Sequence, residues 1–170
     1  MRLRAATPEA GHSEKGATAI EVGFTVVLLF GLVFLVMDLS MLLFVRSTLQ
    51  QAVREGVRYG VTGRQYGSNT YLNDSIRQVV QAEALGLLNG TAGACKIQIN
   101  YVNPDSGAAS TGTQGDVLMV SVNSYNYTPL GAVLRRADPF SISVSSSDVL
   151  ERCPVGGCPI TQNPTPLSCN

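Results

Sequence analysis

The sequence has no tryptophan and a single histidine, His12, so histidine-based acid–base chemistry is almost excluded. Only 14% of its 170 residues are charged, and the formal net charge is zero. Without a basic field to attract phosphates, we expect no nucleic-acid partner. The sequence also lacks a phosphate-binding glycine loop with its lysine and closely paired acids, so we expect no enzyme activity, no cofactor and no metal ion.

Large aliphatic side chains are concentrated in one segment rather than spread along the chain. Sixteen uncharged residues run from Val22 to Met37, and the apolar run resumes after Asp38 as far as Val45. A helix over residues 17–45 would be about 43 Å long, compared with about 30 Å for the hydrocarbon core of a bilayer. The segment therefore predicts one membrane span.

Residues 1–16 are hydrophilic and contain no apolar run, unlike the core of an ordinary secretory signal. They predict a cytoplasmic leader, whose basic residues favour a cytoplasmic N-terminus and place everything after Val45 outside the membrane. Two acids interrupt the span. An acid at bilayer depth costs about 2.5–3.5 kcal/mol, so Glu21 needs a partner or a function, whereas Asp38 lies near the far interface.

The helical pattern continues beyond the membrane. Val45, Leu49, Val53 and Val57 are spaced by four, as in an amphipathic helix. We therefore predict one helix over residues 17–60, which spans the membrane to about residue 45.

Residues 61–152 are predicted to form a small α+β head domain. Apolar residues at helical spacing within residues 70–90 predict a second helix, with Asn89-Gly90 as its stop signal. Three segments with period-two alternation predict a three-stranded antiparallel sheet covered on one face. These segments are residues 96–102, 116–128 and 140–151. A Cys- and Pro-rich tail, predicted to be irregular, occupies residues 153–170.

The sequence EKGATAIEVGF combines Lys15-Gly16, small residues, Glu21 and the start of the apolar run. This pattern resembles the class III signal peptide of type IV pilins. The resemblance implies that a prepilin peptidase cuts between Gly16 and Ala17, so that Glu21 becomes the fifth residue of the mature chain. It also implies that Glu21 pairs with the N-terminal amine of the same or a neighbouring subunit during assembly.

Residues 14–60 resemble one particular group within the pilin-like proteins. The stretch FVRSTLQQAVREGVRYG is similar to the end of the helix in TadE-like minor pseudopilins of tight-adherence (Tad/Flp) pili, with Val53 inserted before Arg54. The charged side chains of the helix that are candidate subunit contacts are Asp38, Arg54, Glu55 and Arg58. A solvated helix face with weak ion pairs of about 0.2–0.5 kcal/mol is the alternative for the last three.

The resemblance implies a minor pilin or pseudopilin that initiates or decorates a Tad/Flp-type pilus in surface attachment. Its partners would be a prepilin peptidase, other Tad pilins and pseudopilins, and the inner-membrane assembly platform. It would lie in a bacterial inner membrane with a periplasmic head, before incorporation into a surface pilus. The alternatives are a major filament subunit, or a non-cleaved bitopic membrane protein with an extracytoplasmic binding head.

The four cysteines all lie on the side predicted to be oxidising, which favours disulfides. A zinc site is the alternative, although no histidine accompanies them. Four cysteines allow three pairings. Proximity in sequence favours Cys153 with Cys158, which leaves Cys95 to pair with Cys169.

Overall fold

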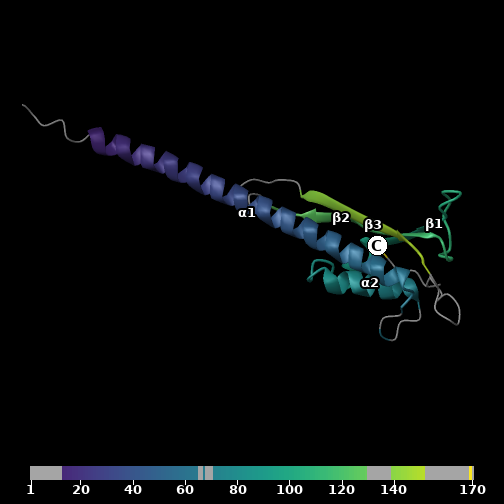
Figure 1. The fold of residues 1–170 in the computed structure, drawn as a ribbon. Coiled ribbons are helices and arrows are strands. Elements are labelled where there is room, and N and C mark those ends of the chain that lie inside the picture. The colour runs from purple at the N-terminus through teal and green to yellow at the C-terminus, as the bar shows by residue number, and fades with distance from the viewer. Residues whose placement is uncertain (1–12, 65–66, 68–70, 130–138, 152–168, 170) are drawn as a thin grey trace, which may run out of the picture.

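The computed structural model describes residues 13–64, 67, 71–129, 139–151 and 169. Figure 1 shows a long helix that projects from one end of a small head. The elements, in chain order, are α1 (Ser13–Val61), α2 (Leu72–Glu83), α3 (Gly90–Ala94), β1 (Ile97–Val102), β2 (Val117–Tyr127) and β3 (Phe140–Val149). This arrangement is the α+β fold predicted from the sequence.

Helix α1 runs without a break over 49 residues, or about 73 Å. It begins at Ser13 rather than at Ala17, so the Lys15-Gly16 dipeptide lies inside the helix. No proline interrupts this stretch, and a single glycine disfavours a helix by only about 1 kcal/mol. The helix ends in a turn closed by a 3.0 Å hydrogen bond from the Gly63 amide to the carbonyl of Gly60.

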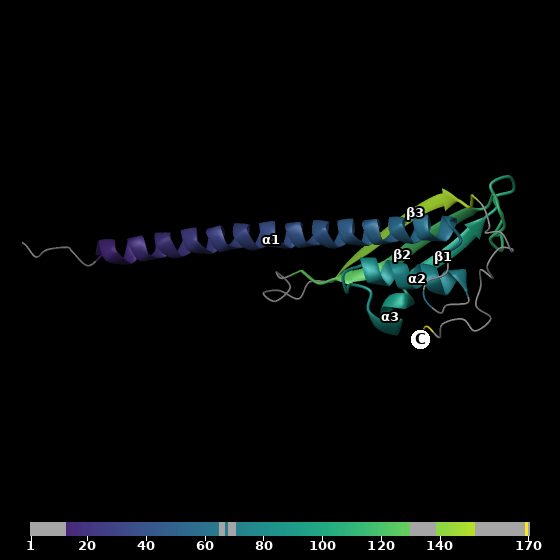
Figure 2. The same cartoon turned by 60° about the horizontal axis from the view of Figure 1, so that its bottom comes forward.

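The sheet has the order β1-β2-β3, with both pairs antiparallel. On β2, Leu118, Val120 and Val122 are fully buried, whereas Met119 is 38% exposed. The predicted one-sided burial is therefore confirmed for these positions. Figures 1 and 2 show the head-side half of α1 lying along the sheet, with α2 beside it.

Two glycines of α1 allow its close contact with α2 and the sheet. A Cβ atom on Gly56 would lie 2.4 Å from the Cγ2 of Val80 in α2. A Cβ atom on Gly60 would lie 2.4 Å from the Cδ2 of Leu118 and 2.8 Å from the Cδ1 of Ile76. Both glycines are buried, so they serve packing within the head and do not only end the helix.

Helix α2 is shorter than predicted, because it ends at Glu83 and not at Asn89. The chain then adopts positive φ at Leu85 and Gly86, which a helix cannot continue through. The side-chain amide of Gln81 donates to two carbonyl oxygens of this turn, and the short helix α3 follows.

A bulge changes the direction of side chains near the end of β2. The register shifts between Val122 and Tyr125, and Ser124 has a φ of 55°. One extra residue in β2 reverses the alternation, because side chains in a strand alternate with period two. Tyr125 and Tyr127 therefore join the core side of the sheet, where they are partly buried against the apolar cluster.

Candidate assembly and membrane surface

The N-terminal half of α1, from Ile20 to Phe44, is apolar and largely uncovered by the other described elements, and it is called the bare half below. Eighteen of its nineteen large apolar side chains between Ile20 and Phe44 are between 37% and 76% exposed, and only Leu42 is half-buried. Each would contribute up to about 1.5–3 kcal/mol on full burial, so leaving this surface in water costs tens of kcal/mol. By length and composition, this helix could cross a membrane.

Gly16 and Glu21 lie at the start of this bare surface. A Cβ atom on Gly16 would meet nothing within 4 Å, and the same holds for Gly23 and Gly31. The packing of the described chain therefore does not require glycine at these positions. Glu21 is exposed, and its carboxylate forms no ion pair with the described residues.

Asp38 lies where the bare surface meets the head. The half-buried Asp38 borders an apolar depression of about 240 Å³ between α1 and the end of β2. The residues that line it are Leu35, Asp38, Leu39, Leu42, Tyr127 and Pro129. Desolvation raises the pKa of Tyr127, and the negative charge of Asp38 raises it further, as expected for neighbouring groups.

Arg54, Glu55 and Arg58 form a separate exposed group. The Nη1 atom of Arg58 lies 3.9 Å from the Oε2 atom of Glu55, and their side chains are 81% and 48% exposed. Such a pair stabilises the fold little. Arg54 is about 24 Å along the helix from Asp38, so the structure does not bring the four charged candidates together. The inserted Val53, in contrast, is fully buried.

A buried aspartate, Asp116, is hydrogen-bonded to residues of the loop between β1 and β2. The Oδ2 atom of Asp116 accepts hydrogen bonds from the Ser110 hydroxyl at 2.5 Å and from the amide and hydroxyl of Thr113 at 2.6 and 2.7 Å. The Ser110 hydrogen bond, followed by those from Thr113, lowers the pKa of Asp116. The Asp116 carbonyl also accepts from the Leu150 amide, so this residue ties the loop to the end of β3.

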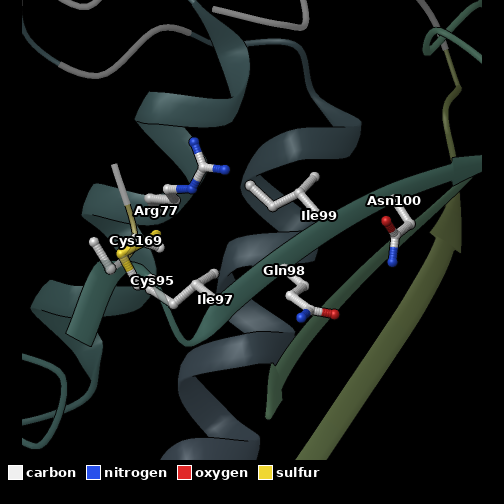
Figure 3. Close-up of a pocket in the computed structure, with 8 residues that line it drawn as sticks. Arg77, Cys95, Ile97, Gln98, Ile99, Asn100 and Cys169 are labelled. Atoms are coloured by element: carbon white, nitrogen blue, oxygen red, sulfur yellow. A yellow bond between two sulfur atoms is a disulfide. The ribbon is translucent and has the colours of Figure 1, made fainter. Parts of the chain in front are cut away.

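A disulfide joins Cys95, after α3, to Cys169. Cys153 and Cys158 lie outside the described residues. The disulfide borders an open depression of about 270 Å³. Figure 3 shows Arg77 of α2 next to the disulfide, with Ile99 and Asn100 of β1 farther away. An Nη1 atom of Arg77 lies 3.3 Å from Asp74 Oδ1, so this guanidinium already has a counter-charge. Among the described residues, no group of three or more His, Cys, Asp or Glu side chains could hold a metal ion.

The contact of Tyr127 with α1 was not predicted from the sequence. The sequence nevertheless contains a local indication of the bulge that makes this contact possible. The alternation of apolar and polar residues from Leu118 to Val122 fails at Asn123-Ser124 and resumes out of phase at Tyr125. A break of this kind between two strand segments indicates a bulge.

Comparison with known proteins supports the interpretation of α1. The model of the TadE-like protein family matches residues 16–58, which confirms the resemblance expected from the sequence. No curated protein and no solved structure matches the chain. The match covers the bare half of α1 and most of the half that packs in the head, whereas α2 and the sheet lie outside it.

Proposed function

From the TadE-like segment at residues 16–58 and the bare apolar half of α1, we propose that the chain is a minor pilin or pseudopilin of a tight-adherence (Tad/Flp) pilus. The observation that carries this proposal is the continuity of α1. The same unbroken helix leaves one half bare and builds the core of the head with the other half. Such a subunit can exchange lipid for neighbouring helices without refolding its head.

Processing by a prepilin peptidase would occur between Gly16 and Ala17. The absence of any packing contact at Gly16 supports a role in recognition by another protein, because the fold gains nothing from glycine there. A peptidase needs extended backbone at the cut, and glycine lowers the cost of opening the helix by about 1 kcal/mol relative to alanine.

Glu21 would then act in assembly. Positions 17 and 21 are four residues apart in α1, so they lie on the same side of the helix about 6 Å apart along its axis. A new amine at Ala17 would supply a counter-charge to the Glu21 carboxylate in lipid, from the same or a neighbouring subunit. We therefore expect Glu21→Gln to impair incorporation into pili more than insertion into the membrane.

Before assembly, the proposed subunit lies in a bacterial inner membrane with its N-terminus cytoplasmic and its head periplasmic. Its partners are the peptidase, other Tad pilins and pseudopilins, and the assembly platform. The head has no catalytic role in this proposal. The exposed group Arg54, Glu55 and Arg58 is available for contact with neighbouring heads.

The test is intact mass with N-terminal sequencing of membrane-extracted protein, expressed beside its own peptidase. We expect a mature wild-type chain that begins at Ala17 and an uncut Gly16→Ala variant. Gly23→Ala is the matched control, because it makes the same change in the same helix at another contact-free glycine, and we expect normal cleavage. An intact leader in the wild type would contradict the proposal and favour a bitopic binding protein.

A second measurement distinguishes a minor from a major subunit. Surface pili are sheared off, and the amount of the chain is compared with that of the total pilus protein. A scarce component supports the proposal, whereas a dominant one would make the chain the filament's main subunit.

A further inference from the structure

The sheet lies lengthwise along α1, with the C-terminal end of β2 directed toward the bare half of the helix. Gly60 approaches Leu118 near one end, and Asp38 meets Tyr127 at the other. The helix between Asp38 and Gly60 measures about 33 Å, and the strand between Leu118 and Tyr127 measures about 30 Å. The two elements therefore run side by side in opposite directions, and in Figure 1 the arrow of β2 points toward the bare half of α1.

The head limits how far lipid can reach along α1. From Ala17 to Met37 the helix is about 31 Å long, which matches the roughly 30 Å hydrocarbon core. Beyond Asp38, Leu42 is half-buried and Val45 is only 3% exposed, because the head covers that side of the helix. Lipid therefore cannot surround the helix on all sides at Val45.

The end of the sheet nearest the bare half has the chemistry of a membrane interface. Tyr127 pairs with Phe140 across β2 and β3, and Phe140 is 55% exposed. Aromatic rings with a polar tip are enriched at the headgroup level of bilayers. Pro129 lies beside Tyr127 in the same apolar depression.

Other sides of α1 also carry apolar surface just beyond Asp38. Met41, Leu43 and Phe44 are 50–54% exposed and do not line the depression beside Tyr127. Water would be a poor environment for three large apolar side chains this close together. Met41 lies about 6 Å beyond Met37 along the axis, within the headgroup layer, which is about 5–7 Å thick on each side of the core.

We propose that this end of the head, formed by Tyr127, Pro129 and Phe140 with Asp38 of α1, rests in the lipid headgroup layer and sets the depth of the helix. Its partner is the bilayer surface on the head's side. The proposal goes beyond the pilin function, because it requires only that α1 crosses a bilayer and needs neither cleavage nor assembly. A neighbouring copy of the chain is the competing occupant.

The absence of tryptophan makes a direct test available, since each substitution introduces a single fluorophore. Tyr127→Trp reports on the proposed contact, Phe24→Trp on the middle of the span, and Val149→Trp on the far end of the same sheet. Val149 is a matched surface control, because it is 46% exposed and about 30 Å from Phe140 along β3. The full chain is reconstituted at low density in vesicles that contain lipids brominated either near the headgroup or deep in the acyl chain.

We expect Tyr127→Trp to be quenched at least about twofold more by shallow bromines than by deep ones, as for interfacial aromatic residues. Phe24→Trp should show the reverse order, and Val149→Trp should be quenched by neither lipid. Phe140→Trp gives a second reading at the same level, in case tryptophan at position 127 disturbs the contact with Asp38. Near-ultraviolet circular dichroism of each variant checks that the head remains folded.

If both Tyr127→Trp and Phe140→Trp behave like Val149→Trp while Phe24→Trp is quenched, the head stands clear of the bilayer and the proposal is overturned. It is also overturned if their emission shifts to the blue only when protein density is raised, because a neighbouring copy then covers the surface. An unquenched Phe24→Trp would instead remove the membrane span itself, and the proposed pilin function with it.

Discussion

Replacing Gly56 by alanine tests how closely α1 and α2 must approach. The added Cβ would lie 2.4 Å from Val80 Cγ2, whereas carbon atoms pack best at about 3.5–4.0 Å. The helices must therefore separate by about 1 Å, because a valine side chain in a helix has almost no other rotamer to adopt. Overpacking of this kind costs about 1–3 kcal/mol, and the better helix propensity of alanine recovers up to about 1 kcal/mol.

We expect a net destabilisation of about 1–2 kcal/mol, or a fall of about 5–10 °C in Tm for a head of this size. The assay is thermal unfolding of the full chain in detergent micelles, followed by near-ultraviolet circular dichroism of the tyrosines. Gly31→Ala is the control, because its Cβ would meet nothing within 4 Å. A Tm for Gly56→Ala equal to or above that of the wild type would refute the argument that glycine sets the distance between the helices.

Two further predictions concern pH and reduction. Because hydrogen bonds lower the folded-state pKa of Asp116, its ionised form stabilises the fold above the ordinary aspartate pKa of about 3.9, and this contribution is lost as pH falls through the folded value. Urea titrations at falling pH should therefore show a steeper loss of stability in the wild type than in Asp116→Asn, and equal slopes would contradict this assignment. Reducing the Cys95–Cys169 disulfide opens a loop with a sequence separation of 74 residues, and it should cost about 2–4 kcal/mol in a urea titration. The double Cys→Ser variant should already be destabilised and insensitive to reductant; if reductant lowers its stability as well, the effect belongs to other cysteines.

The sequence predicted most of the fold because its patterns are local. The apolar run required a long helix, and the alternation at Leu118, Val120 and Val122 located the buried face of the central strand. Helix α2 was predicted too long because Leu87 and Leu88 continue its apolar spacing, whereas the positive φ at Gly86 breaks the helix before them.

The contacts of the candidate site were harder to predict because they depend on distances between elements. Nothing in the sequence around Asp38 indicates that Tyr127 lies beside it, since that contact depends on the bulge at Ser124 and on the alignment of β2 with α1. Gly56 and Gly60 are four residues apart, a spacing that suits close helix contact, but the sequence alone does not identify α2 as the partner.

Because α1 is unbroken, the packing of its bare half also fixes the height and the orientation of the head. No proline occurs between Ser13 and Val61, and the glycines at 56 and 60 are packed against the head, so the head cannot swivel about the part of α1 that it covers. A shift of one residue in the packing of the bare half would move the head by about 1.5 Å and turn it by about 100°. Deleting a single residue near Gly31 would therefore present a different side of the head to its surroundings while leaving the head itself unchanged.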